Sequence, residues 1–385
     1  MGKRKTNHQN CTLKEINIIS FDVPFPPNYG GIIDVFFKIK YFHSKGIKVH
    51  LHCFEYGREA QKELEKYCES VHYYKRKTGL VSNLSLLPYI VKSRISGKLK
   101  QNLLKNNFPI LFEGLHTTYL LDDKDFKARK KIFREHNIEH DYYRHLSNAE
   151  KNPIKKLYYL VESIKLKYYE KIVTKADVSL ILSMTDLKYF KHSYPHSKFV
   201  FVPTFHNADK IKIKPGKGDY VLYHGNLSVL ENSVAAKFII NKIFNDLDIP
   251  LVIAGLNPGK ELKDLVKKHK NITLIANPED SKLNELIFNA QINFLYTNQA
   301  TGLKLKLLNV LYNGRFCLVN SKMIEGTTLS DICIVKNDID DIKDTITKLS
   351  GMELSDAEIE KRKNILEEDY SNSNSFKTII EALKA

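Results

Sequence analysis

The feature that most constrains the fold is an alternation of short apolar strands with helical patterns, which begins near residue 16 and begins again near residue 220. In the first half, the apolar strand Ile16–Ser20 is followed by the loop FDVPFPPNYGG, a helical pattern over Ile32–Ser44 and a second strand at Lys48–Phe54. Strands that are joined through helices lie parallel in one sheet. The first half is therefore predicted to form a parallel α/β sheet, with further strands at Ile110–Phe112, Lys131–Arg134, Val178–Leu182 and Phe199–Val202.

The second half repeats this order after a linker-like stretch, KIKIKPGKG, at Lys210–Gly218. It is predicted to contain strands at Tyr220–Tyr223, Pro250–Ala254, Ile272–Ile275, Ile292–Tyr296, Phe316–Asn320 and Ile332–Val335, with helices at Ser233–Ile243, Lys282–Asn289 and Leu303–Tyr312. The expected fold class is α/β, with two tandem Rossmann-like, doubly wound parallel-sheet domains facing each other across a cleft. Such sheets bind ligands outside the carboxyl ends of their strands, so we expect the ligand in that cleft.

Charge separates the two halves. The chain has 60 Lys and Arg against 44 Asp and Glu, and residues 209–385 contain 24 of each kind, so the first 208 residues carry the whole net charge of +16. A basic unit favours an anionic partner such as a membrane surface, a phosphorylated substrate or a nucleic acid. No nucleic-acid module is recognisable, so no nucleic acid is expected. One basic cluster, Lys151–Lys171, has helical spacing of its apolar residues and is interpreted either as a solvated amphipathic helix or as an interfacial helix.

Several classes of protein are excluded or disfavoured. The five cysteines are odd in number and form no C-x-x-C pair, which argues against a disulfide framework and a structural zinc site. No apolar run approaches the ~20 residues of a membrane span, and the first residues, MGKRKTNHQNCTLKE, lack the apolar region of a signal peptide. We expect a cytoplasmic protein, at most peripheral on the inner face of a membrane. The absence of G-x-G-x-x-G and Walker A motifs disfavours nicotinamide enzymes and P-loop NTPases.

Two segments have the chemistry of a phosphate site. Gly30 and Gly31 stand immediately before a predicted helix, where backbone N–H groups and the helix dipole favour an anion. In Gly302–Asn309, GLKLKLLN, the residues Lys304 and Lys306 lie in a first helical turn, where cations oppose the helix dipole unless an anion binds. These segments predict contacts to a bound phosphate.

The motifs in this order resemble those of the GT-B glycosyltransferases, most closely glycosyltransferase family 4. In the second half, YVLYHGNLSVLENS, IPLVIAGLNPG, KNITLIANPED and TGLKLKLLNVLYNGRFCLVNS resemble the family's opening strand, central strands and donor-site helix. In the first half, FPPNYGG, REHNIEHDYY and LILSMTDLKYF resemble the acceptor-side glycine loop, a His-Asn segment and a late helix entry. The resemblance covers roughly residues 16–350.

This resemblance implies a glycosyltransferase of the hexosyltransferase type (EC 2.4). It would move a sugar from a UDP- or GDP-linked donor to a hydroxyl of a glycan or lipid-linked acceptor in surface polysaccharide synthesis, with retention and without a required metal or other cofactor. Residues 1–208 would be the basic acceptor-side domain, 209–370 the nucleotide-sugar domain, and 371–385 a helix crossing back to the first domain. The partners implied are the nucleotide sugar, the acceptor and an anionic membrane surface met by the basic half.

The resemblance also assigns residues to the donor. They are Gly30, Gly31, Gly225, Asn226, Thr301, Gly302, Lys304, Lys306 and Asn309. The family's E-x7-E pair is replaced by Thr301 and Asn309, and its Arg after the glycine by Asn226, so this version of the motif is degenerate. The lysines are expected to supply the missing positive charge against the leaving diphosphate.

The catalytic candidates follow predicted strands of the first half. They are His116, His136 and Glu113, with Asn28 and Asn137 on the acceptor side. In a retaining reaction the departing phosphate would take the acceptor proton, whereas an inverting enzyme would need a base such as Glu113, Asp22 or His116. Two other functions stay open: a nucleotide-sugar epimerase, which needs no basic face, and a scaffold or regulatory partner of another transferase, to which the missing carboxylates would point.

Overall fold

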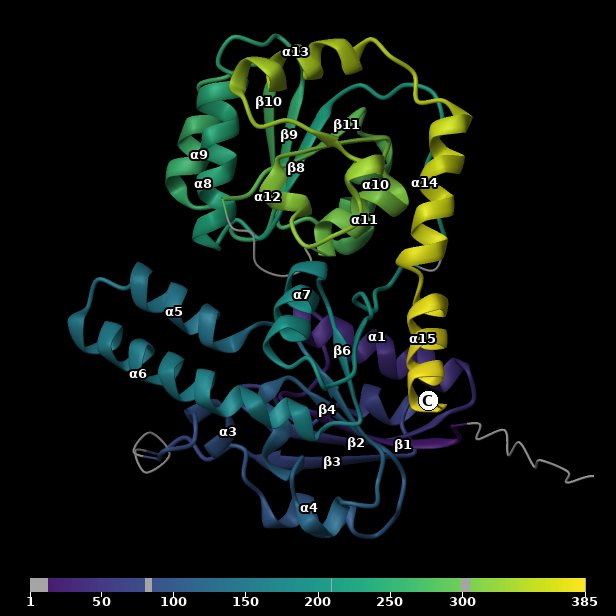
Figure 1. The fold of residues 1–385 in the computed structure, drawn as a ribbon. Helices are drawn as coiled ribbons and strands as arrows, with labels where there is room; N and C mark the ends of the chain where they lie inside the picture. The colour runs from purple at the N-terminus through teal and green to yellow at the C-terminus, as the bar shows by residue number, and fades with distance from the viewer. Residues whose placement is uncertain (1–12, 80–84, 209, 299–304, 385) are drawn as a thin grey trace, which may run out of the picture. The chain divides into compact units, whose positions relative to one another are not determined.

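The structure is a computed structural model that describes residues 13–79, 85–208, 210–298 and 305–384. The chain divides into two compact units (Figure 1). Unit 1 comprises Met1–Leu182, Asp186–Phe205 and Ser375–Ala385, and unit 2 comprises Ser183–Thr185 and His206–Asn374. Among the described residues, no helix combines the length and the apolar character needed to span a membrane.

Unit 1 is built on a sheet of seven parallel strands in the order β3-β2-β1-β4-β5-β6-β7. The strands are β1 (Glu15–Ser20), β2 (Lys48–Glu55), β3 (Ser70–Lys75), β4 (Ile110–Glu113), β5 (Lys131–Arg134), β6 (Val178–Ile181) and β7 (Phe199–Phe201). The helices are α1 (Gly30–Ser44), α3 (Tyr89–Lys92), α4 (Gly97–Leu103), α5 (Glu139–Ala149), α6 (Pro153–Tyr169), α7 (Met184–Ser193) and α15 (Asn372–Lys384).

Successive side chains along the strands of unit 1 point to opposite faces of the sheet, so an apolar layer forms on each face. Ile16 and Ile18 of β1 share one core cluster with α1 and α15, whereas Ile19 belongs to a second cluster with Leu99 and Leu103 of α4. Short 3-10 helices at Lys62–Lys66, Leu115–Leu120, Lys124–Phe126 and Glu170–Lys175 connect the elements. Because both sheet faces are covered, the strand ends are the part of the sheet that is open to ligands.

Helices α5 and α6 lie side by side as a hairpin that projects away from the strands (Figure 1). The two helices are joined through polar contacts, in which Ser147 Oγ donates to the carbonyl of Lys156 and Ser163 Oγ to the carbonyl of His140. Asn152 caps α6 by accepting from the backbone of Ile154 and Lys155, and Pro153 occupies the first helical turn.

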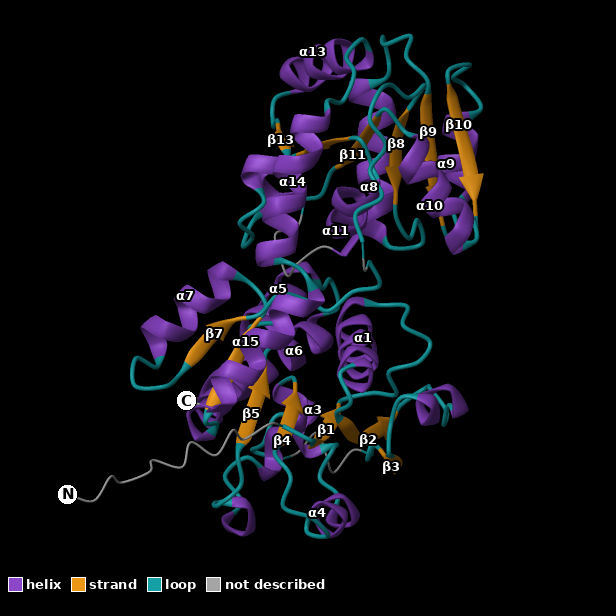
Figure 2. Ribbon diagram, turned by 90° about the vertical axis from the view of Figure 1, so that its right-hand side faces the viewer, coloured by secondary structure: helices purple, strands orange, loops and turns teal. Residues whose placement is uncertain are grey.

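Unit 2 contains a sheet of six parallel strands in the order β10-β9-β8-β11-β12-β13 (Figure 2). The strands are β8 (Val221–His224), β9 (Leu251–Gly255), β10 (Ile272–Ala276), β11 (Ile292–Leu295), β12 (Phe316–Val319) and β13 (Ile334–Val335). The helices are α8 (Leu230–Phe238), α9 (Lys260–Val266), α10 (Asp280–Asn289), α11 (Leu305–Asn313), α12 (Ser321–Ile324), α13 (Ile339–Ser350) and α14 (Asp356–Asp369), with a π-turn at Ile239–Ile243 and a 3-10 helix at Ser330–Ile332.

The predicted fold class is confirmed: each half of the chain forms an all-parallel α/β sheet. The structure differs from the predicted elements in two informative places. Strand β3 (Ser70–Lys75) was not predicted, because its residues are half-buried and alternate with polar side chains at the sheet edge. Helix α1 starts at Gly30, so Gly30 and Gly31 are its first two residues and not the end of the preceding loop.

Candidate active site

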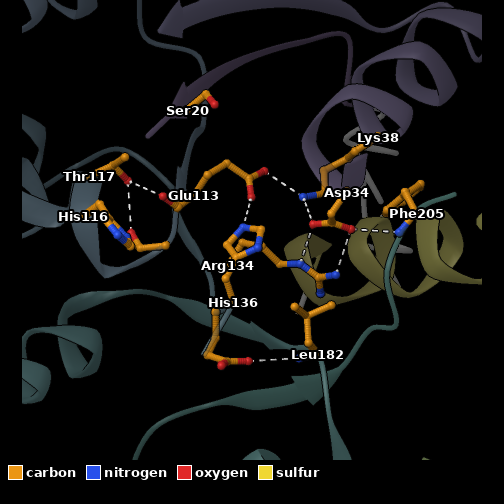
Figure 3. Close-up of polar contacts among 12 residues, drawn as sticks. Ser20, Asp34, Lys38, Glu113, His116, Thr117, Arg134, His136, Leu182 and Phe205 are labelled. Carbon is orange, nitrogen blue, oxygen red and sulfur yellow. Dashed lines mark hydrogen bonds and ion pairs between the residues drawn. The ribbon is translucent and has the colours of Figure 1, made fainter. Parts of the chain in front are cut away.

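A buried cluster of charged side chains lies where β4 and β5 of unit 1 end (Figure 3). Glu113 is the last residue of β4 and Arg134 the last of β5, while Asp34 and Lys38 lie one turn apart on α1. Lys38 Nζ is 2.7 Å from Glu113 Oε1 and 2.9 Å from Asp34 Oδ2. Arg134 Nε donates to Asp34 Oδ2 at 3.0 Å, and its Nη2 to Asp34 Oδ1 at 3.1 Å. The cluster ties α1 to the carboxyl edge of the sheet.

The two carboxylates and the two cations of this cluster balance each other. Burial alone would raise the pKa of Asp34, but Arg134 and Lys38 outweigh it and hold that pKa below its usual range. In the same way burial opposes ionisation of Glu113, while Lys38 and His136 lower its pKa overall. Ligand atoms of Asp34, Glu113 and His136 lie within 4.8 Å of one another. Lys38 nevertheless already bonds both carboxylates, so a metal ion would have to displace a buried ammonium, and the group does not fit a metal site.

His136 extends this cluster toward the start of α1. Its Nε2 is 2.9 Å from Glu113 Oε2, and the residue is buried. A carboxylate at Nε2 fixes the proton there and leaves Nδ1 as an acceptor. A β-carbon added to Gly31 would lie 3.4 Å from Nδ1 of His136 and 2.8 Å from the Phe21 ring, so any larger residue here would have to displace that ring. The free nitrogen of a carboxylate-held imidazole therefore lies close to a helix N-terminus.

His116 lies in the 3-10 helix after β4 and completes the group. The ring of Phe21 contacts both histidines, with ring centres 5.2 Å from His116 and 5.3 Å from His136. His116 Nδ1 is 3.8 Å from Oε1 of Glu139, the first residue of α5. Burial holds the pKa of His116 well below its usual range, and burial raises the pKa of Glu139 to about 7. Near neutral pH the imidazole is therefore uncharged beside a carboxyl group that is partly protonated.

Replacing Glu139 with glutamine is expected to stabilise unit 1 at pH 8 and to leave its stability nearly unchanged at pH 5. The folded-state pKa of about 7 exceeds the ordinary value of 4.5. Between these pH values the folded protein retains a proton that the unfolded chain releases, so wild-type stability falls as the pH rises through this window. Glutamine does not ionise, and the gain at pH 8 should be roughly 3 kcal/mol in urea unfolding.

The exposed Glu381 of α15 offers the matched control for this experiment. Glu381→Gln should leave the unfolding free energy unchanged within about 0.5 kcal/mol at both pH values. An equal effect of Glu139→Gln at pH 5 and pH 8 would contradict the raised pKa.

The acceptor-side candidates lie beside this group. Arg58 donates to Asn28 Oδ1 from both Nη1 (3.1 Å) and Nη2 (3.0 Å), and Tyr29 OH donates to Asp22 Oδ2 at 2.9 Å. These four residues line a pocket of about 570 Å³ at the ends of β1 and β2. Asn137 is exposed and hydrogen-bonds the Glu139 carboxyl. Amide, carboxylate and aromatic groups in one pocket are suited to sugar hydroxyls.

In unit 2 a lysine lies at the end of β8. Lys306, in the first turn of α11, donates from Nζ to Asn232 Oδ1 at 3.2 Å, and Nζ is 5.6 Å from the centre of the Tyr223 ring. Burial and the Lys306 charge together lower the pKa of His224 to about 3. A β-carbon on Gly225 would lie 3.1 Å from Asn232 Cγ, so the glycine backbone lies directly against this lysine-bound amide.

The remaining donor candidates are dispersed. Asn226 Oδ1 accepts from the backbone and side chain of Ser228, which closes a turn after β8. Asn309 donates to Asn284 Oδ1 at 3.3 Å and lines a pocket of about 530 Å³ with Asn284, Asn313 and Lys210. Thr301, Gly302 and Lys304 lie outside the described residues. Gly30 and Gly31, also assigned to the donor, belong to unit 1.

The sequence analysis missed Asp34, Lys38, Arg134 and Asn232. Asp34 and Lys38 are four residues apart on a helix whose other inward positions, such as Val35, Ile39 and Phe42, are apolar. A charged pair at helical spacing within an apolar stripe is the signal that could have identified them.

Comparison with known proteins identifies one similar sequence of unestablished function. A Klebsiella pneumoniae protein, described as an uncharacterized 44.6 kDa protein in cps region, is 29% identical over 339 residues, which is 82% of this chain and 85% of that protein. No protein-family model matches the chain.

Solved structures match nearly the whole chain. The sucrose-phosphate synthase of Thermosynechococcus elongatus covers 95% of it with a TM-score of 0.63 at 12% identity, over 97% of its own length. An Anabaena protein, HepE, in complex with UDP and glucose covers 96% with a TM-score of 0.63 at 9% identity, over 99% of its own length. Both are GT-B structures. The chain has the GT-B fold. Because the identities are this low, the likeness establishes the GT-B architecture of both units and leaves the reaction to be argued from the residues.

Proposed function

We propose that this GT-B protein transfers a sugar from a nucleotide-sugar donor to a hydroxyl group of a glycan or lipid-linked acceptor. The observation that carries the proposal is the pair of polar groups at the carboxyl edges of the two sheets. One edge holds a carboxylate-bound imidazole, His136 with Glu113, and the other holds the cation of Lys306 beside Gly225. Sugar transfer needs a positive charge at the departing diphosphate and a polar group that positions a sugar hydroxyl, and these two edges can supply both.

The donor diphosphate is assigned to unit 2. Lys306 lies near the start of α11, where the ammonium and the helix N-terminus both attract an anion. The HepE structure is a complex with UDP and glucose, which supports a UDP-linked donor. Lys306 then neutralises the charge that develops on the departing diphosphate.

The acceptor and the reacting centre are assigned to unit 1. His136 accepts a hydrogen bond from a sugar hydroxyl at Nδ1, while Asp22, Asn28, Tyr29 and Arg58 hold the acceptor sugar in their pocket. With retention, the proton passes to the departing phosphate and no metal is required. The description of the Klebsiella relative, in a cps (capsule) region, supports a surface polysaccharide as product. We place the enzyme in the cytoplasm, with its basic unit 1 against an anionic membrane surface.

Replacing Lys306 with alanine is expected to weaken nucleotide binding by about 10- to 100-fold, the contribution of a charge-assisted hydrogen bond. Thermal melting with UDP, GDP, CDP and dTDP measures this. A nucleotide at ~100 times its dissociation constant adds about 2.7 kcal/mol, which raises the melting temperature of a unit this size by about 5–10 °C. The shift should appear with one nucleotide and should fall to about half or less in Lys306→Ala at the same nucleotide concentration.

Lys267→Ala is the control, because Lys267 is exposed at the end of α9. It should keep the full nucleotide shift. If none of the four nucleotides shifts the melting temperature of the wild-type protein, the transferase proposal is contradicted and the scaffold function is favoured.

A further inference from the structure

Helix α6 (Pro153–Tyr169) has its polar side toward the protein. Glu162, Ser163 and Leu166 are buried on its inner side, and the first two are polar. Glu162 Oε2 accepts from the backbone N–H of Tyr89 at 2.6 Å, and Ser163 Oγ donates to the carbonyl of His140 at 2.7 Å. The next turn continues this side with buried Glu170, which accepts from Tyr189 and Tyr194. The helix is therefore seated largely by hydrogen bonds, with Leu166 as the one fully buried apolar side chain among its described residues.

The outer side of α6 is apolar. Its exposed side chains, between 41% and 79% accessible, are Ile154, Leu157, Leu160, Val161, Ile164 and Tyr168. Their spacings of three, four and seven residues place them on one side of the helix. A surface helix of a soluble protein normally has the opposite arrangement, with the apolar stripe toward the core. We call these six residues the outer stripe.

The outer stripe continues into an apolar pocket. Ile164 and Tyr168 line a pocket of about 530 Å³ together with Tyr169, Ile172 and Leu86, and Leu86 is 95% exposed. The polar residues of its lining are Asp122, Lys165, Lys171, Thr174 and Lys175. Scattered apolar side chains on a surface need no explanation, but a continuous exposed stripe that leads into an apolar pocket marks an interaction site.

The charges around the outer stripe are mostly positive, and the exposed carboxylate of Asp122 in the adjoining pocket lies 3.6 Å from Lys175 Nζ. Residues 151–175 contain seven lysines and two acidic residues, Glu162 and Glu170, both of which are buried. Lys156 and Lys167 flank one side of the stripe and Lys165 the other, from their positions on the helix. An apolar strip bordered by lysines, with a tyrosine at its end, complements a layer with an apolar interior and anionic headgroups.

We propose that the outer stripe of α6 lies on an anionic membrane, with its apolar side chains among the acyl chains and its lysines at the phosphates. An exposed apolar stripe bordered by lysines matches the acyl chains and the phosphates of one anionic membrane surface, which favours this occupant. This proposal rests on the proposed function in one respect: it identifies the surface through which that enzyme would contact a membrane. The observations on α6 do not depend on which reaction the protein catalyses.

The chain contains no tryptophan, so a single tryptophan introduced at Tyr168 reports on this surface alone. The test adds vesicles of 70% phosphatidylcholine and 30% phosphatidylglycerol to the Tyr168→Trp variant at 0.1 M salt. The tryptophan fluorescence is expected to shift to the blue and to be quenched when the acyl chains are brominated. Neutral phosphatidylcholine vesicles should give a much weaker response. Leu230→Trp, at a residue of unit 2 that is 77% exposed, is the control and should not respond.

Variants test the two contributions separately in vesicle sedimentation with the full chain. Leu157→Ser with Ile164→Ser should lower the partition coefficient by at least about tenfold, since both side chains are exposed in water and lose only the lipid contact. Lys156→Gln with Lys167→Gln should lower it by about thirtyfold, and 0.5 M salt should do the same to the wild type. The paired control, Lys267→Gln with Lys268→Gln in unit 2, should have no such effect.

Unchanged emission of Tyr168→Trp with anionic vesicles would overturn the proposal. So would a protein that self-associates through this face, with Leu157→Ser and Ile164→Ser converting a dimer to a monomer. Nucleotide-dependent melting of the same variants separates the two proposals, because loss of vesicle binding with an intact nucleotide shift concerns only the α6 surface.

Discussion

Replacement of His136 with alanine is expected to lower the rate of sugar transfer by about 10- to 100-fold, because the sugar hydroxyl loses the hydrogen bond to Nδ1 that positions it. The imidazole is held at Nε2 by Glu113 and directs Nδ1 toward the start of α1. Alanine removes the acceptor atom and keeps the ion pair between Lys38 and Glu113, so unit 1 should remain folded. Product formation from the nucleotide sugar identified by melting measures the effect.

The nucleotide-induced shift in melting temperature should survive in His136→Ala, because the donor contacts are proposed for unit 2. His145→Ala is the matched control, since His145 is an exposed histidine on α5 of the same unit, and it should retain the wild-type rate. Full activity of His136→Ala would remove this residue from the reaction and would redirect attention to His116.

Replacement of Asp34 with alanine is expected to destabilise unit 1 by about 3–5 kcal/mol, because it leaves a buried cation without its partner. Arg134 would lose both bonds to the carboxylate, and Lys38 would retain only Glu113. The backbone N–H of Phe205 would also lose its acceptor, Asp34 Oδ1 at 2.8 Å. For a unit of this size the melting temperature should fall by about 10 °C or more.

Acid titration provides an independent check on Asp34. Its folded-state pKa lies below the ordinary value of 3.8, so its stabilisation is present above that value and is lost as the pH falls below it. The Asp34→Ala variant should therefore lose this part of the acid dependence. Glu69→Ala removes an exposed ion pair with Lys48 and should cost less than about 1 kcal/mol. A similar small loss for Asp34→Ala would refute the role assigned to the buried cluster.

The alternation of apolar strands and helical patterns was sufficient to predict two parallel sheets. Strands buried on both faces are nearly continuous apolar runs, and Ile16–Ser20 and Ile292–Leu295 are of this kind. The edge strand β3 escaped prediction because its sequence, SVHYYK, lacks such a run. Edge strands are half-solvated, and their residues carry a weaker signal.

Periodicity identifies the stripe of a helix but not the direction in which the stripe points. The spacing in Lys151–Lys171 predicts the helix that α6 forms, yet only the structure places Glu162 and Ser163 inside and Leu157 outside. Likewise, Lys38 would ordinarily be assigned to a solvated helix face. Its burial depends on Glu113, 75 residues later, and such a distant partner leaves no mark on the local pattern.

The position of the last helix, α15, in the chain determines when unit 1 can be completed during translation. Phe376, Ile379 and Ala382 pack into the core of unit 1, where Phe376 contacts Phe42 of α1 at a ring-centre distance of 5.4 Å. Residues 206–374, which form nearly all of unit 2, lie before them in the chain. Translation therefore delivers unit 2 before it delivers the segment that covers α1. A nascent chain that has emerged as far as residue 374 still exposes the end of α1 near Phe42, which α15 later covers, to chaperones and to neighbouring nascent chains.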